Sequence, residues 1–245
     1  MSRSIFNKLA TDKLAAQQAW KARFENRTLP TKADCQTKAI EVKAAVEANT
    51  TEILLYDEIG VWGITASVFV AALNTITTPN IRVRINSPGG DVFDGLAIYN
   101  ALANHKGNVT CVVDGLAASA ASFIALAGKT VSIHENAMMM IHRAWGVAIG
   151  NQADMADMVT VLGKIDAQLA GIYAKQTGKS VEEMSALMAG DTDGTWFTAQ
   201  EAAALSMVDE IISPDEEDDE EDDDTNKAVA RIHAMRRRLA LAERE

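Results

Sequence analysis

The stretch IRVRINSPGGDVFDGLAI, residues 81–98, decides the fold that the sequence predicts. Its first residues, Ile81 to Ile85, form a short apolar-rich run typical of a strand, and a helix is expected to begin near Val92. The turn between them holds two adjacent glycines, Gly89 and Gly90, which can adopt backbone angles closed to other residues. Parallel α/β sheets are built from strands that alternate with helices in this way.

The same alternation of strand and helix continues on both sides of this stretch. Strands are predicted over residues 53–56, 81–85, 109–113, 130–133 and 137–141. Helices are predicted over residues 65–73, 92–104, 118–127, 152–176, 181–188 and 199–204. Gly178 is a suitable stop signal for the long helix, and Thr198 is a suitable N-cap with Glu201 three residues later. The pattern predicts a mainly parallel sheet with crossover helices.

The composition is that of a globular protein. Of the 245 residues 48% are apolar and 23% are charged, and there are four prolines, which excludes a collagen-like or wholly disordered chain. The two cysteines, Cys35 and Cys111, are too few and too isolated for a metal cluster or a disulfide framework. Cys111 lies in the apolar run Val109 to Val113, which predicts a buried structural thiol. A reducing cytoplasm fits this usage.

The charge divides the chain into four segments. We expect a helical extension over residues 1–50, a folded domain over 51–213, an acidic disordered linker over 214–225 and a basic tail over 226–245 that is compatible with a helix. The extension shows helical spacing at Ala10, Leu14, Ala15 and Ala19 and again at Ile40, Val42, Ala45 and Val46. The net charge of −11 would be −1 without the ten acidic residues 215–224, so it says little about what the folded part binds.

Membrane and nucleic-acid partners are not expected. No stretch of eighteen apolar residues exists to span a bilayer, and charges interrupt the N-terminal residues where a signal peptide needs an apolar segment. A basic face for nucleic acid is not evident. We therefore expect a cytoplasmic protein.

Three features could carry chemistry. The amides of the Gly89-Gly90 turn could face a developing anion, although a tight turn without function explains the glycines equally well. Ser119 lies among small residues at the start of a helix, where its hydroxyl could act as a nucleophile or serve as an N-cap. His142 directly follows a strand and could accept a proton from a serine or be a hydrogen-bonded strand-end residue.

Five motifs together resemble the ClpP serine peptidases: SPGGDVFDGLAIYNAL, GLAASAAS, MMMIHRAWG, IYAKQTGKS and WFTAQEAAALSMVDEII. The similarity runs from about Glu52 to Ile212. It implies the ClpP/crotonase-like α/β fold, with repeated β-β-α units and a mainly parallel sheet flanked by helices. By this resemblance Ser119 is the nucleophile, His142 is the general base, and the amides of Gly90 and Ala120 form the oxyanion hole.

The third residue of the triad departs from the family pattern. The family carries an aspartate two positions before the phenylalanine of TWFTAQEA, and this chain has Thr195 there. Asp193 is the nearest carboxylate that a rearranged loop could bring to His142, and Asp191 is the second choice. A solvated loop acid is the alternative for each, and a Ser–His pair oriented by backbone or water would retain part of the activity.

Other departures make the chain more similar to the ClpP-like head maturation proteases of tailed bacteriophages than to the housekeeping enzyme. They lie in YDEIGVWGITASVFVAAL and TWFTAQEA, and the N-terminal extension and the charged tail also depart from the compact housekeeping form. This resemblance implies protein substrates, namely scaffold, capsid or portal proteins, and a homo-oligomeric ring inside the host cytoplasm or the prohead. No cofactor or metal is implied. The housekeeping N-terminal segment that docks an ATPase has no counterpart in residues 1–50, which argues against an ATPase partner.

Two other classes of function remain open on the sequence. A crotonase-like enzyme acting on an acyl thioester would share the fold and the amide oxyanion hole but would not need the hydroxyl of Ser119. A non-catalytic capsid assembly factor would use its charged tails to bind capsid proteins. A Ser–Lys peptidase is disfavoured because no lysine stands at the position of His142. The long helix 152–176 carries apolar residues that could serve either oligomer contacts or the core of one subunit.

Overall fold

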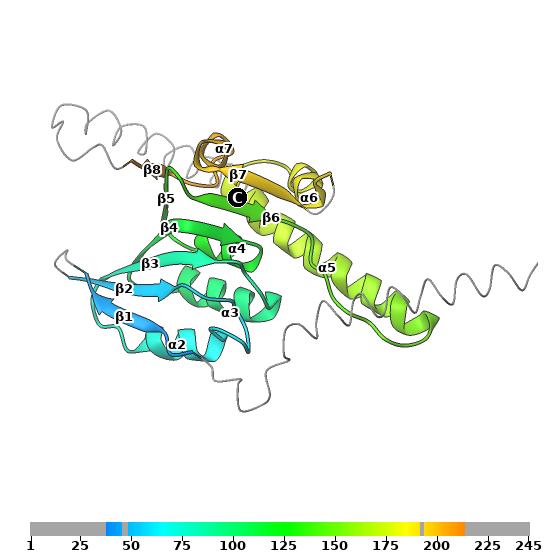
Figure 1. The fold of residues 1–245 in the computed structure, drawn as a ribbon, viewed down its shortest axis with the longest axis horizontal. Coiled ribbons are helices and arrows are strands. Elements are labelled where there is room, and N and C mark those ends of the chain that lie inside the picture. Colours follow the sequence, from blue (N-terminus) through cyan, green and yellow to red (C-terminus); the bar gives the residue numbers. More distant parts are fainter. Residues whose placement is uncertain (1–37, 46–48, 192–193, 214–245) are drawn as a thin grey trace, which may run out of the picture. The chain divides into compact units, whose positions relative to one another are not determined.

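The computed structural model describes residues 38–45, 49–191 and 194–213 (Figure 1). The strands are β1 (Glu41–Ala44), β2 (Thr50–Leu55), β3 (Asn80–Ser87), β4 (Asn108–Ala118), β5 (Thr130–His134), β6 (Met138–Ile141), β7 (Thr195–Thr198) and β8 (Glu210–Ile212). The helices are α2 (Ala66–Asn74), α3 (Val92–Ala103), α4 (Ala120–Ala125), α5 (Gln152–Thr177), α6 (Val181–Ala189) and α7 (Ala199–Ala204). No described helix is long and apolar enough to cross a membrane.

The strands form one sheet in the order β1-β2-β3-β4-β5-β8. β2, β3, β4, β5 and β8 run parallel to one another on this path. β1 pairs antiparallel with β2 at the edge of the sheet. The long strand β4 pairs with β5 through its first half and with β6 through its second half. β6 in turn pairs antiparallel with β7. The predicted α/β class with a mainly parallel sheet is confirmed.

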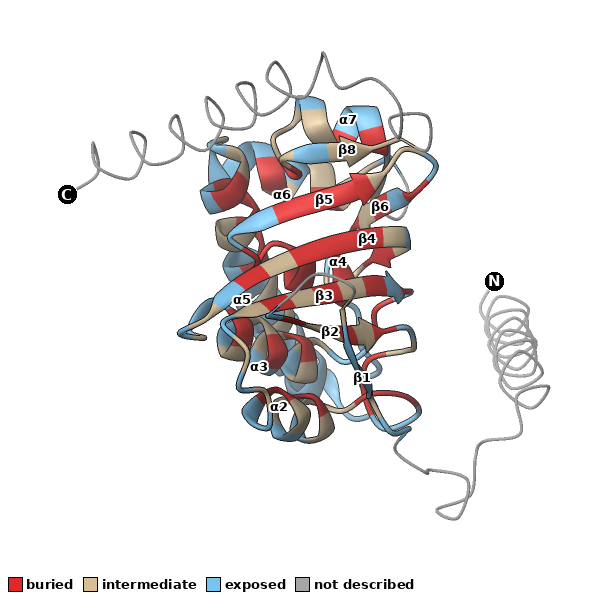
Figure 2. Ribbon diagram, turned by 90° about the vertical axis from the view of Figure 1, so that its left-hand side faces the viewer, coloured by how far each residue is buried: buried red, intermediate tan, exposed pale blue. Residues whose placement is uncertain are grey.

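The core lies between the sheet and the helices. Figure 2 looks onto the sheet, with buried residues along β3, β4 and β5 and with α3 and α4 behind the strands. Ile85, Val113, Ile98 and Phe123 are at most 1% exposed and join one hydrophobic cluster. Cys111 is fully buried in the same cluster, which confirms the prediction of a buried thiol.

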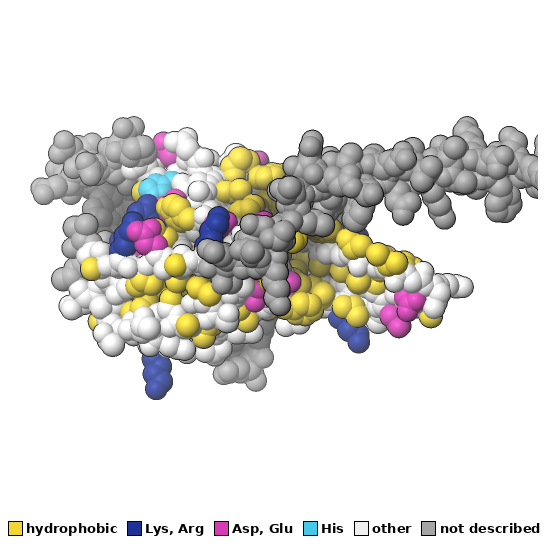
Figure 3. Space-filling view, turned by 60° about the horizontal axis from the view of Figure 1, so that its bottom comes forward, with side chains coloured by type: hydrophobic (Ala, Val, Ile, Leu, Met, Phe, Trp, Pro, Cys, Tyr) yellow, Lys and Arg dark blue, Asp and Glu magenta, His cyan; other side chains and the backbone are white. Residues whose placement is uncertain are grey.

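Helix α5 is docked at one end only. Its carboxyl-terminal half carries buried Leu169 and Tyr173, whereas Val159 in its amino-terminal half is 71% exposed. This half extends away from the sheet in Figure 1, and Figure 3 shows hydrophobic side chains along it. The helix ends at Gly178 in the left-handed conformation, with φ +71°, which confirms the predicted stop signal.

The N-terminal boundary and one helix were predicted wrongly. Residues 41–44 form the edge strand β1 rather than part of a helix, because their backbone pairs with β2 while all four side chains are exposed. Edge pairing of this kind depends on main-chain hydrogen bonds and leaves no apolar alternation in the sequence. The sheet therefore begins before residue 51. The predicted helix around Ala10 to Ala19, the acidic linker and the basic tail lie outside the described residues, as does Cys35.

Candidate active site

Ser119 occupies a strained position between a strand and a helix. β4 ends at Ala118 and α4 begins at Ala120, and Ser119 between them has φ +52° and ψ −122°. Residues other than glycine rarely adopt such backbone angles, which persist only where the surrounding structure enforces them. The amide of Ser119 donates to the carbonyl of Met140 at 2.9 Å. The capping alternative is wrong, because the Ser119 side chain makes no capping hydrogen bond.

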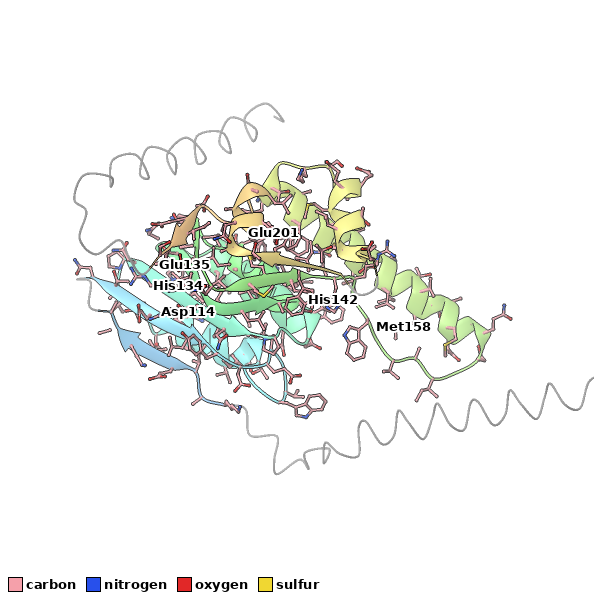
Figure 4. All side chains as sticks on the ribbon, turned by 45° about the horizontal axis from the view of Figure 1, so that its top comes forward. Asp114, His134, Glu135, His142, Met158 and Glu201 are labelled. Carbon is pink, nitrogen blue, oxygen red and sulfur yellow. The ribbon has the colours of Figure 1, made fainter. Side chains whose placement is uncertain are left out.

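His142 meets the Ser119 hydroxyl. The Nε2 atom of His142 lies 2.8 Å from Oγ of Ser119. β6 carries His142 to this position, because it pairs with the end of β4 on one side and with β7 on the other. Figure 4 shows His142 at the end of β6, where the chain leaves the sheet towards α5. With the imidazole proton on Nδ1, Nε2 accepts the hydroxyl proton of Ser119, which is the geometry of a nucleophile beside its base.

The glycine turn packs directly against this serine. Gly89 has φ +90° and Gly90 has φ +146°. A Cβ on Gly89 would lie 2.7 Å from Cβ of Ser119 and 2.8 Å from the amide nitrogen of Ala120. The turn is held on its other side by Ile59, whose amide donates to the Gly89 carbonyl and whose carbonyl accepts from Asp91, both at 2.8 Å. The chain segments that carry the Gly90 and Ala120 amides therefore lie against each other at the serine.

Gly194, directly before β7, packs against His142. Gly194 has φ +92°, and a Cβ on it would lie 2.5 Å from Cβ of His142. Asp193 lies outside the described residues, and Asp191 is exposed. Thr195, at the family position of the acid, donates its hydroxyl to the Leu187 carbonyl at 2.5 Å. Its side chain is therefore engaged with α6.

An acidic residue that the sequence did not single out positions the chain after His142. Asp166 of α5 accepts a hydrogen bond from the Ala144 amide at 2.7 Å, and the neighbouring Arg143 amide donates to the Met188 carbonyl at 3.1 Å. These bonds fix the direction in which the chain leaves His142. Asp166 gives no sequence signal of this role, because a carboxylate on an amphipathic helix ordinarily faces water.

Cysteine and metal chemistry find no support in the described part of the chain. Burial raises the pKa of the Cys111 thiol to about 12, so at neutral pH it is not the thiolate that nucleophilic attack requires. Within the same residues no group of three His, Cys, Asp or Glu side chains could hold a metal ion. The Ser119–His142 pair is thus the nucleophilic arrangement to explain.

The fold and this serine–histidine pair define a ClpP-like α/β protein. The family model described as Clp protease matches residues 39–215, so the chain belongs to the Clp protease family. The match begins at residue 39 and so includes β1, in agreement with the sheet.

Two curated relatives are similar over slightly more than half of the chain. The ATP-dependent Clp protease proteolytic subunit 2 of Nocardia farcinica (strain IFM 10152) is 37% identical over 140 residues, which are 56% of this chain and 66% of the relative. The ATP-dependent Clp protease proteolytic subunit of Bacteroides fragilis is 35% identical over 136 residues, which are 54% of this chain and 64% of the relative. The chain therefore spans slightly less than two thirds of each relative's length.

Proposed function

We propose that this protein is a serine endopeptidase with Ser119 as its nucleophile and His142 as its general base. The 2.8 Å contact between Oγ of Ser119 and Nε2 of His142 carries the proposal. It joins residues that are distant in sequence, at the strained end of a strand and beside a glycine turn. Membership of the Clp protease family and similarity to two proteolytic subunits support the same chemistry.

The reaction is acyl transfer. Oγ of Ser119 attacks the peptide carbonyl while its proton passes to Nε2 of His142, and the carbonyl oxygen becomes an oxyanion. The amides of Gly90 and Ala120 stabilise that oxyanion. When the tetrahedral adduct collapses, the C–N bond breaks and His142 returns the proton to the leaving amine. A water molecule, deprotonated by His142, then releases the acyl group from Ser119 and regenerates the enzyme.

The carboxylate that orients His142 is assigned to Asp193, with Asp191 as the second choice. The close packing of Gly194 on His142 supports this assignment, because Gly194 directly follows Asp193 in the chain. The hydroxyl of Thr195 is already bonded to Leu187. The acid of this protein would therefore come from the loop rather than from the start of β7.

The substrates are protein chains that bind in extended form beside the site, and the subunits assemble as a homo-oligomeric ring. Extended peptides commonly add to a sheet edge through main-chain hydrogen bonds. The apolar side chains on the projecting half of α5 support assembly: Met155 is 38% exposed, Val161 47% and Val159 71%. Such a row of exposed apolar residues is typical of a surface that is covered by a partner.

The biological role that fits the sequence best is maturation of a bacteriophage head. The resemblance of YDEIGVWGITASVFVAAL and TWFTAQEA to phage head maturation proteases supports this role. Scaffold, capsid or portal proteins would be the substrates, in the host cytoplasm or inside the prohead. The two relatives are named as subunits of ATP-dependent proteases; for this chain we assign no ATPase partner.

Active-site labelling tests the chemistry. The full chain is treated with a fluorophosphonate probe and assayed on peptide esters, together with Ser119→Ala and with Ser132→Ala as a matched control. Ser132 is a buried serine of β5 whose hydroxyl donates to Glu210 rather than to Ser119 or His142. Label on the peptide that contains Ser119, and its loss only in Ser119→Ala, is the expected result. An unlabelled wild-type chain contradicts the proposal.

Co-expression tests the role separately from the chemistry. The wild-type chain and Ser119→Ala are each expressed with the scaffold, capsid and portal proteins encoded in the same genome. Wild-type protein should shorten at least one of them, and Ser119→Ala should leave all of them intact. If the scaffold, capsid and portal proteins all remain full-length while the wild-type enzyme still cleaves peptide esters, the phage role is refuted. The proposed peptidase activity is then unaffected.

A further inference from the structure

Two buried hydroxyl groups connect helix α5 to the carbonyl of Ser119. Oγ of Ser122, in α4, lies 2.6 Å from the Ser119 carbonyl oxygen and 2.7 Å from the hydroxyl oxygen of Tyr173, in α5. Ser122 is fully buried and Tyr173 is 1% exposed. Both hydroxyl groups therefore make their hydrogen bonds to other protein groups rather than to water.

The direction of the two hydrogen bonds follows from their chemistry. A carbonyl oxygen only accepts, so the single proton of the Ser122 hydroxyl is donated to Ser119. Ser122 must then accept from Tyr173, whose O–H is the donor. Burial raises the pKa of Tyr173, which keeps that proton in place. The chain of donors runs from Tyr173 through Ser122 to the carbonyl of Ser119.

The carbonyl at the end of this chain belongs to the same peptide plane as the Ala120 amide. In a trans peptide the C=O and N–H bonds point in opposite directions, so fixing one of them fixes the other. The amide and the hydroxyl of Ser122 both donate to the Ser119 carbonyl, at 3.0 and 2.6 Å. At the nitrogen end of the same peptide plane, the Ala120 nitrogen lies 2.8 Å from where a Cβ on Gly89 would be.

We infer that Tyr173 and Ser122 are positioning residues that hold the Ser119–Ala120 peptide plane so that the Ala120 amide points at the developing oxyanion. The inference rests on the proposed function, because it requires Ser119 to be the nucleophile. The strained backbone of Ser119 makes such a hold necessary, since φ +52° is not a conformation that serine adopts by itself. Neither hydroxyl touches the substrate; both act through the peptide plane.

Replacement of each hydroxyl tests the inference in the full chain. Tyr173→Phe keeps the aromatic ring and removes the hydroxyl that donates to Ser122. Ser122→Ala removes both side-chain hydrogen bonds, the one from Tyr173 and the one to the Ser119 carbonyl. Tyr99→Phe in α3 and Ser132→Ala in β5 are the matched controls, because they remove the same atoms elsewhere in the fold. The measurements are kcat and KM for a peptide ester and the inhibition constant of a peptide boronate, whose adduct with serine places an oxygen in the oxyanion hole.

We expect kcat to fall about tenfold in Tyr173→Phe, which is within the range of one hydrogen bond, with KM unchanged. Boronate inhibition should weaken by a similar factor, and the two controls should match the wild type. A lower unfolding midpoint with unchanged kcat and boronate affinity would show that the hydrogen bonds of Tyr173 and Ser122 only hold α4 and α5 together. That result would overturn the inference and would leave the proposed peptidase activity unaffected. If the wild-type chain neither labels at Ser119 nor cleaves esters, the proposed function fails, and this inference fails with it.

Discussion

Gly89 and Ser119 are in contact at the point where the glycine turn meets the end of β4. A Cβ on Gly89 would lie 2.7 Å from Cβ of Ser119 and 2.6 Å from the Ala118 carbonyl oxygen, both closer than real Cβ atoms come to their neighbours. The approach is possible because glycine has no side chain and tolerates the observed φ of +90°. The turn and the serine therefore depend on each other for their position.

Gly89→Ala should damage activity more than stability. The new methyl group must displace Ser119 or the Ala120 amide, so kcat/KM is expected to fall by about 100-fold or more, the cost of losing one oxyanion donor. The unfolding free energy should fall by about 1–3 kcal/mol, because alanine is strained at this φ. Peptide ester hydrolysis and urea unfolding measure the two effects.

Gly171→Ala in α5 is the matched control for this substitution. A Cβ there meets no atom within 4 Å, so the change should leave activity intact. It should raise the unfolding free energy by up to about 1 kcal/mol through helix propensity. Near-normal activity in Gly89→Ala would contradict the role that we give to the turn.

Most of the fold could be predicted from sequence because its helices and buried strands carry local signals. The capping box of Thr198 and Glu201 and the left-handed Gly178 stand where they were predicted. β1 and β8 give no such signal: β1 has four exposed side chains, and β8 is three residues long. β1 is defined by its pairing with the next strand, β2, and β8 by its pairing with the distant strand β5.

The site was predicted by resemblance, and one part of it could not be predicted at all. No periodicity links Ser119 to His142, and the motifs alone suggested their contact. The Ser122–Tyr173 bond joins residues 51 positions apart, and nothing in the local sequence marks either hydroxyl as the partner of the other. Contacts of this kind depend on how α5 docks on α4, which local sequence does not encode.

Tyr56 should make stability depend on pH at the alkaline end. Its hydroxyl donates to Asp114, which also accepts from Nη2 of Arg84 at 2.7 Å; Figure 4 shows Asp114 beside His134 on the sheet. Burial and, next, the hydrogen bond to Asp114 raise the pKa of Tyr56 from 10.0 to about 12. Below pH 10 the proton is present in both states, whereas between about pH 10 and 12 only the folded protein retains it, so stability falls as pH rises.

Urea unfolding of the wild type and Tyr56→Phe at several pH values tests this linkage. The difference between their unfolding free energies should be constant up to about pH 9 and should shrink from about pH 10 upwards, because phenylalanine has no proton to lose. Asp114→Asn should lower the pKa of Tyr56, so that the phenolate absorbance rises at a lower pH than in the wild type. A difference that stays constant through alkaline pH would contradict the assignment.

Cys111 should react only when the central sheet opens. Its thiol is fully buried, its pKa is raised to about 12, and its backbone is paired with Val83 and Val131 on the two neighbouring strands. In a Cys35→Ser background, alkylation at neutral pH should be at least about 100-fold slower in the native protein than in urea. Rapid alkylation without denaturant would show that β4, the strand leading to Ser119, opens on its own.

The loop that precedes β7 should supply the carboxylate that orients His142. Gly194 packs on His142, so we expect the acid to be Asp193, the residue before it, whereas the hydroxyl of Thr195 is bonded to the Leu187 carbonyl. Asp193→Asn keeps the size of the side chain and removes its charge. We expect kcat to fall by roughly 100-fold to 10,000-fold, which is the effect of losing a triad carboxylate. The neutral asparagine side chain does not stabilise the imidazolium form of His142 as a carboxylate does.

Asp191→Asn and Thr195→Val are the controls that separate this role from a general disturbance of the loop. Both should retain kcat within about twofold, since Asp191 is exposed and the Thr195 side chain is engaged with α6. A large loss in Asp191→Asn with normal Asp193→Asn would move the assignment to Asp191. Normal rates in both aspartate variants would mean that His142 is oriented without a carboxylate from this loop, because a group that stabilises the imidazolium cannot be neutralised without cost.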